Sequence, residues 1–323
     1  MKKAIILLAV TVLLISMVSG ATKPDVKKVR EEHEAELFAI EGVSGVSVDE
    51  EKKEIIVYIE RSEISKEVPK FIDGFPVRHE VIGRIEALQA TTAAETLITP
   101  YQATTYSRTA RNRPVFGGIS VGNPKITAGT LGLITYDNYV LSNAHVLAMD
   151  SKANFLPIGT PTLQPGPYDG GTLDEQIGAL YKYIPIQFNR ITANNYADAA
   201  ISTLTVSGDQ GKVLNKTNDG FYTINGTTSV SKGDEVRKSG RTTGVTENTI
   251  VDTEATVKVY YTKSKWAIFR DQILVKQQFS EGGDSGSAVD KDGQFVGLVF
   301  AGSETVTVVC KAKYVVSGLG ITI

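Results

Sequence analysis

A serine stands between two glycines near the end of the chain, in Glu281-Gly-Gly-Asp-Ser-Gly-Ser-Ala-Val-Asp290. Glycine lets the backbone take dihedrals that other residues avoid, and it lets a ligand come close. The N–H groups of Gly283 and Ser285 could therefore converge on a developing oxyanion. A polar hairpin turn could have the same sequence, and chance produces Gly-Asp-Ser-Gly in on the order of one such chain in a hundred. The serine in this motif can act as a nucleophile only if a base lies beside it.

His145 and Asp198 supply the groups that such a serine needs. A serine hydroxyl is a weak nucleophile until a base removes its proton, and histidine is the usual base near neutral pH. His145 is the only histidine after residue 113, and Asp198 stands before an apolar run. A buried carboxylate there could orient the imidazole and offset its positive charge. The order His, Asp, Ser is one of the few that such triads use, so we predict acyl-transfer chemistry.

The composition of the chain narrows the classes of protein to which it could belong. The chain has 323 residues, 41% of them hydrophobic, with a net charge of −2 and a single cysteine. A globular protein rich in strands and turns fits these values. The balanced charge does not favour nucleic acid or an anionic membrane surface as a partner. One cysteine excludes an internal disulfide framework.

The first twenty residues have the layout of a secretory signal peptide. Lys2 and Lys3 precede an apolar run over residues 4–18, and small residues follow, so cleavage is expected after Gly20 or Ala21. An uncleaved anchor is the alternative, although the run is short for a full membrane span. We therefore predict a signal peptide at residues 1–20 and a secreted protein.

Residues 22–88 are predicted to form a small α/β domain without a catalytic constellation. His33 and His79 have no partner at the spacing of a metal site, so we expect neither metal nor cofactor. The apolar pattern predicts helices at 25–40 and at 62–72, the second capped by Ser62 and shortened by Pro69, and strands at 43–48, 54–59 and 75–82.

Residues 89–113 are predicted to be an exposed linker. They are rich in threonine and alanine, lack periodicity and end in Arg108, Arg111 and Arg113. Such segments attract proteolytic nicking, although a plain tether has the same composition. The domain before the linker is then either a removable pro-region or an accessory domain that stays attached.

After Pro114 short apolar runs alternate with turn signals, which is typical of an all-β domain. Residues 157–171, rich in Pro and Gly, are predicted to be a surface loop. Alternation over residues 305–314 places Cys310 on an inward face as a core thiol. The predicted strands are 126–136, 139–142, 177–184, 199–204, 220–224, 235–239, 249–261, 265–277, 287–289, 295–301 and 305–314.

Several segments of this domain resemble the chymotrypsin-like (trypsin-like, S1-type) serine proteases, above all the secreted bacterial α-lytic and streptogrisin-like group. The resemblance covers residues 114–323. The cysteines that flank the histidine, the Arg-Thr-Thr-Gly segment and the serine in many relatives are absent from this sequence. The matching segments are Val115-Phe-Gly-Gly-Ile119, Leu141-Ser-Asn-Ala-His-Val146, Asp198-Ala-Ala-Ile201, Val236-Arg-Lys-Ser-Gly-Arg-Thr-Thr-Gly244 and Gly283-Asp-Ser-Gly-Ser287.

The resemblance implies an all-β double antiparallel barrel, with His145 and Asp198 from the first barrel and Ser285 from the second. It also implies an oxyanion hole at Gly283 and Ser285. A cation from the Arg-Thr-Thr-Gly strand, Lys238 or Arg241, is expected to pair with Asp284.

The resemblance locates a substrate pocket near Phe279, where trypsins carry an aspartate, so a basic substrate residue is not favoured. Phe300, Ala301 and Gly302 should line the cleft and pair with a substrate backbone as an added strand.

The favoured function is a secreted serine endopeptidase that acts on polypeptides through an acyl-enzyme. A pro-region within the same chain is a further expected partner. A catalytically silent protease-like binding or adhesion module is the alternative. An esterase-type hydrolase would be expected to carry Gly-x-Ser-x-Gly, which this serine lacks.

Overall fold

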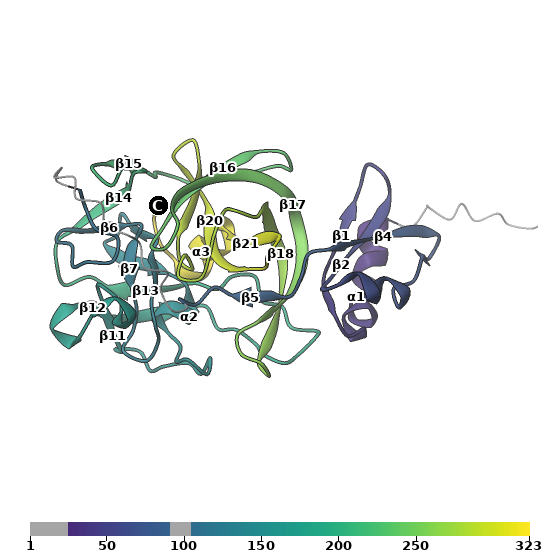
Figure 1. Cartoon of the computed structure of the whole chain (residues 1–323), viewed down its shortest axis with the longest axis horizontal. Coiled ribbons are helices and arrows are strands. Elements are labelled where there is room, and N and C mark those ends of the chain that lie inside the picture. Colours follow the sequence, from purple (N-terminus) through teal and green to yellow (C-terminus); the bar gives the residue numbers. More distant parts are fainter. Residues whose placement is uncertain (1–24, 91–104) are drawn as a thin grey trace, which may run out of the picture.

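The computed structural model describes residues 25–90 and 105–323. The predicted signal peptide, and most of the predicted linker, lie outside the described residues. The part of the chain that is described is mostly β-strand, with a small helix-containing unit at its N-terminal end (Figure 1). No helix within it is both long enough and apolar enough to cross a membrane.

The N-terminal unit consists of one helix and a four-stranded portion of sheet. Asp25 accepts a hydrogen bond from the Lys27 N–H and caps the helix, as its type at that position favours. Val29 and Leu37 of the helix are buried in the core of the unit. The elements are α1 (Val26–Ala39), β1 (Val43–Asp49), β2 (Glu54–Ile59), β3 (Phe71–Ile72) and β4 (Phe75–Val81).

The predicted helix over 62–72 is wrong. Only one 3-10 turn forms, η1 (Ser62–Lys66), and its cap position is Arg61 without a side-chain hydrogen bond. Pro69 removes a backbone donor and disfavours helical backbone in the residue before it. The chain therefore leaves the turn and enters β3.

The main sheet of the C-terminal unit has the order β16-β19-β20-β21-β18-β17 and continues through β1 into the N-terminal unit. In Figure 1 the long β17 lies between the two units. A short strand, β5 (Ile85–Ala87), pairs with both β17 and β20. The other strands are β16 (Glu235–Gly240), β17 (Gly244–Tyr260), β18 (Trp266–Lys276), β19 (Ala288–Lys291), β20 (Gln294–Gly302) and β21 (Val306–Lys311).

A second sheet has the order β11-β12-β13-β10-β9, and two smaller sheets, β15-β14-β6 and β7-β8, accompany it. Their strands are β6 (Val115–Gly117), β7 (Ile119–Val121), β8 (Gly129–Leu131), β9 (Leu133–Ile134), β10 (Tyr139–Ser142), β11 (Pro161–Leu163), β12 (Gln176–Tyr183), β13 (Ala200–Thr203), β14 (Gly208–Leu214) and β15 (Phe221–Thr223). The remaining helices are α2 (Ala144–Leu147), η2 (Pro167–Asp169), η3 (Leu173–Glu175) and α3 (Ala312–Leu319).

Several segments of this unit differ from the sequence prediction, and strands such as β14 form where none was predicted. The predicted strand over 126–136 breaks at Gly132, where a Cβ would stand 2.4 Å from the Gly286 carbonyl oxygen. The loop over 157–171 contains β11 and η2. The last predicted strand ends at Lys311, and α3 follows with Ala312 and Leu319 buried on one face. Cys310 is buried, as predicted.

At the end of the predicted linker, residues 105–107 and 109–111 are exposed, as predicted, but the segment is not a free tether. Arg108 is partly buried, and one guanidinium nitrogen donates to the carbonyl oxygens of Gly118 and Gly240 and to the Ser239 hydroxyl. Residues 105–113 are therefore bound to the C-terminal unit.

We expect Ile59→Ala to destabilise the N-terminal unit. Ile59 is 0% exposed in the core that α1 and β2 share. Truncating a buried isoleucine costs about 2–5 kcal/mol of unfolding free energy. Val81→Ala is the control, because Val81 is 47% exposed and such changes stay within about 0.5 kcal/mol. Urea denaturation followed by circular dichroism measures both, and equal effects would contradict the packing described.

Candidate active site

His145 and Asp198 are brought together by the pairing of two strands. β10 and β13 are antiparallel, with Ser142 opposite Ala200, so the residues just beyond these positions meet at one edge of the sheet. His145 Nδ1 lies 2.7 Å from Asp198 Oδ2, and the His145 N–H donates to Oδ1 at 3.1 Å. Both side chains are buried. The carboxylate holds the imidazole in one orientation.

Tyr261 is a third member of this cluster, and the sequence analysis missed it. Its hydroxyl donates to Asp198 Oδ2 at 2.6 Å. Burial by itself raises the pKa of Asp198, but the His145 charge and the hydrogen bonds from His145 and Tyr261 outweigh it, so the pKa lies below its ordinary value. Burial and the neighbouring carboxylate raise the pKa of Tyr261 well above its ordinary value. An aromatic residue after a strand gives no sign of this role.

Ser285 lies close to the histidine turn. The Ser285 carbonyl oxygen and the side chain of Val146, the residue after His145, both lie against Gly129, at 3.0 Å and 2.5 Å from the position of a Cβ there. The Ser285 hydroxyl donates to the Phe300 carbonyl oxygen at 3.2 Å. His145 Nε2 is buried and has no hydrogen-bond partner among the described residues. The base is therefore oriented but not yet bonded to the serine.

The loop before Ser285 presents a backbone donor. Gly283 has a φ of +98°, and a Cβ there would stand 2.4 Å from Thr242 Oγ1, so only glycine fits. Its carbonyl oxygen accepts a hydrogen bond from the Thr130 hydroxyl at 2.9 Å. The Gly283 N–H is directed the other way and donates to the Leu88 carbonyl oxygen at 3.1 Å.

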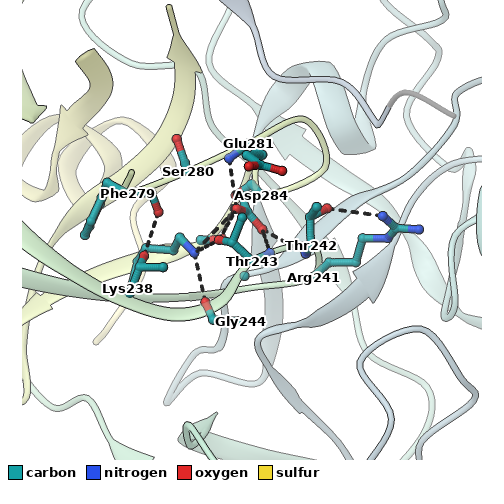
Figure 2. Close-up of polar contacts among 12 residues, drawn as sticks. Lys238, Arg241, Thr242, Thr243, Gly244, Phe279, Ser280, Glu281 and Asp284 are labelled. Carbon is teal, nitrogen blue, oxygen red and sulfur yellow. Dashed lines mark hydrogen bonds and ion pairs between the residues drawn. The ribbon is translucent and has the colours of Figure 1, made fainter. Parts of the chain in front are cut away.

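Asp284 is a buried carboxylate that ties this loop to the turn between β16 and β17, as Figure 2 shows. Lys238 Nζ lies 3.4 Å from Asp284 Oδ2, and both side chains are 0% exposed. The Thr243 hydroxyl donates to Oδ2 at 2.6 Å, and the Thr242 N–H donates to Oδ1 at 2.8 Å. Burial lowers the pKa of Lys238, although the charge of Asp284 works against it.

Arg241 does not take part in this ion pair. Its guanidinium pairs with Asp169, with Nε 2.8 Å from Oδ2. Of the two cations expected at Asp284, the structure places Lys238 there. Arg241 instead fastens the η2 turn to the loop beside the site.

The four residues predicted to line a substrate pocket do not all face one cavity: two have side chains packed in apolar clusters, and two pair with another strand. Phe279 is 0% exposed, within an apolar cluster that Leu88 also contacts. The Phe300 ring packs on Phe269 in the core, with centroids 4.8 Å apart, so only the backbone of Phe300 faces the serine. Ala301 and Gly302 pair with residues of β5.

Cys310 and His33, the other candidates for a nucleophile or a metal ligand considered from their residue types, lie in unsuitable surroundings. Burial raises the pKa of the Cys310 thiol to about 12, so the thiolate is not formed near neutral pH. His33 contacts Glu36 and Asp73 near the surface. The described residues contain no group of His, Cys, Asp and Glu that could hold a metal ion.

No protein-family model matches this sequence, and neither does any curated protein. Solved structures are similar in fold. Cellulomonas bogoriensis chymotrypsin is 17% identical over 65% of this chain and 97% of its own, with a TM-score of 0.45. Thermobifida fusca protease A is 19% identical over 64% and 96%, with a TM-score of 0.47. An α-lytic protease homologue, N4, is 14% identical over 64% and 98%, with a TM-score of 0.46.

The chain matches bacterial chymotrypsin-like proteases over about 65% of its length. These are the proteins that the sequence motifs resemble. Because the TM-scores are below 0.5, the likeness adds nothing to the inference of activity, which depends on the geometry of the site.

We expect Lys238→Met to destabilise the protein by about 3–5 kcal/mol, because it leaves the Asp284 charge buried without its ion partner. The double variant Lys238→Met with Asp284→Asn should recover most of the loss, since the charge itself is then gone. Urea denaturation of the two single variants and the double variant gives the coupling energy. Additive losses would contradict the ion pair.

We expect Asp198 to contribute to acid sensitivity. Its pKa is lower in the folded chain than the ordinary value, so the unfolded chain takes up the proton first as the pH falls. The stabilisation is complete above the ordinary value, about 3.9, and is lost as the pH falls through the folded pKa. Asp198→Asn should therefore lose less unfolding free energy than wild type as the pH falls below about 5. Equal losses in urea titrations would contradict this.

Proposed function

We propose that this protein is a secreted serine endopeptidase with the double-barrel architecture of the chymotrypsin-like proteases. The observation that carries the proposal is the buried His145–Asp198 pair next to a serine loop, with His145 Nε2 unpartnered within residues 25–90 and 105–323. An oriented base with a free nitrogen is the arrangement that a serine nucleophile requires.

The chemistry assigns one role to each group. The Ser285 hydroxyl rotates from the Phe300 carbonyl to His145 Nε2, gives up its proton and attacks the substrate carbonyl carbon. Asp198, held by Tyr261, stabilises the imidazolium that forms. The N–H groups of Gly283 and Ser285 bind the oxyanion.

The leaving amine then takes the proton from His145, and water hydrolyses the acyl-enzyme by the same route in reverse. Each proton moves between groups that the fold holds in place, so no cofactor or metal is part of the proposal.

The N-terminal unit is proposed to be a pro-region rather than a permanent accessory domain. The short strand β5, which follows this unit in the chain, pairs with the segment that we expect to bind substrate, and Ser285 is 0% exposed. A chain arranged in this way cannot admit a second polypeptide to the serine until β5 leaves.

Fluorophosphonate labelling tests the proposed function. We expect label on Ser285 of the wild-type chain, none on Ser285→Ala, and a rate at least about 1,000-fold lower on His145→Ala, as for loss of a triad base. Because β5 covers the serine, the chain with Leu88→Asp is assayed in parallel. The absence of Ser285-dependent label from both folded chains would favour the silent binding module instead.

A further inference from the structure

The chain places its own residues in the cleft in the manner of a bound polypeptide. β5 is antiparallel to β20, with Ala87 opposite Ala301 and Glu86 opposite Gly302. On its other side β5 runs parallel to β17, with Ile85 opposite Val259. An added strand of this kind is how an extended peptide binds to a sheet edge.

Leu88, the next residue, joins this strand to the catalytic loop. Its N–H donates to the Phe300 carbonyl oxygen at 3.2 Å, the same oxygen that receives the Ser285 hydroxyl. Its own carbonyl oxygen accepts the Gly283 N–H at 3.1 Å. The Leu88 carbonyl oxygen therefore occupies the Gly283 N–H, which is one of the two donors predicted to bind the oxyanion.

The Leu88 side chain enters an apolar cluster. It is partly buried against a cluster that contains Phe279, Val299 and Val275. Both Leu88 methyl groups also lie against Gly302, 3.6 Å from the position that a Cβ would take there, which is ordinary contact distance. A charged side chain here would lose its hydration without a partner.

The N-terminal unit fixes the strand in this register. The Ser303 and Thr305 hydroxyls both donate to the Ile82 carbonyl oxygen, the second at 2.7 Å. The Ser44 hydroxyl donates to the Gly83 carbonyl oxygen at 2.7 Å. Beyond Leu88 the chain turns, with the Gln89 N–H bonded to the Ala87 carbonyl oxygen at 2.9 Å.

We propose that residues 85–88 are a built-in substrate and that the protein cuts its own Leu88–Gln89 bond, which makes leucine the residue that it prefers before the cut. This rests on the proposed function. Ser285 Oγ bonds to the Leu88 carbonyl carbon, the bond to the Gln89 nitrogen breaks, and that nitrogen takes the proton through His145. Water then releases the Leu88 carboxylate and restores the serine hydroxyl.

The fragments of the full-length chain test this inference. After expression of the wild-type chain, intact-mass measurement should find an N-terminal fragment whose last residue is Leu88. Its formation should be first order and independent of protein concentration. Ser285→Ala should stay uncut.

Substitutions at residue 88 measure the preference within the chain itself. Leu88→Met, similar in volume, should be cut within about 10-fold of the wild-type rate. Leu88→Asp and Leu88→Lys should be cut at least about 100-fold more slowly. Leu173→Asp is the matched control and should leave cleavage unchanged, because Leu173 is 64% exposed.

Labelling of Ser285 distinguishes failure of the proposed self-cleavage from failure of the proposed function. If the wild-type or the Leu88→Asp chain reacts with the fluorophosphonate but no fragment ends at Leu88, the inference is overturned and the proposed function stands. If neither folded chain reacts and neither is cut, both are overturned. Equal cleavage rates for leucine and lysine at residue 88 would remove the leucine preference.

Discussion

The buried charge of Asp284 is the constraint on which the candidate site depends. A carboxylate with no exposed surface is stable only if it is paired and hydrogen-bonded. Here Lys238 lies at 3.4 Å, and the Thr242, Thr243 and Glu281 backbones and the Thr243 hydroxyl all donate to the carboxylate. Satisfying one charge thus requires the turn after β16 and the loop before Ser285 to adopt one conformation. The direction of the Gly283 N–H follows from it.

The two structural units share more than a linker. β1 of the N-terminal unit pairs with β17, Tyr58 donates to Asp252 at 2.5 Å, and Arg270 forms an ion pair with the buried Glu34 of α1. These contacts do not depend on the Leu88–Gln89 bond. Cutting that bond would therefore not by itself separate the units, and the cleft would open only when these contacts also break.

Some site residues could be predicted from the sequence because their signals are local. Ser285 stands in a Gly-Asp-Ser-Gly sequence, and His145 and Asp198 border apolar strands in a chain order that triads use. The sequence predicts that Asp284 pairs with a cation and offers Lys238 and Arg241 as candidates. Only the tertiary structure shows that Lys238 is the partner.

Other features could not be predicted, because they arise from tertiary contacts. Tyr261 has the sequence pattern of a core aromatic, and its bond to Asp198 joins residues 63 apart. Residues 85–87 are too short for any periodicity, and β5 exists because β17 and β20 supply its partners. In the same way α3 continues an alternating strand pattern, but its buried face has helical spacing.

A crystal structure of the full-length Ser285→Ala chain most directly tests the claim that the site is formed around Asp284 and filled by the chain itself. We expect the Leu88 carbonyl oxygen within hydrogen-bond distance of the Gly283 N–H, with β5 between β17 and β20 and Lys238 against Asp284. A cleft without residues 85–88, or one with a different residue at the Gly283 N–H, would contradict the claim.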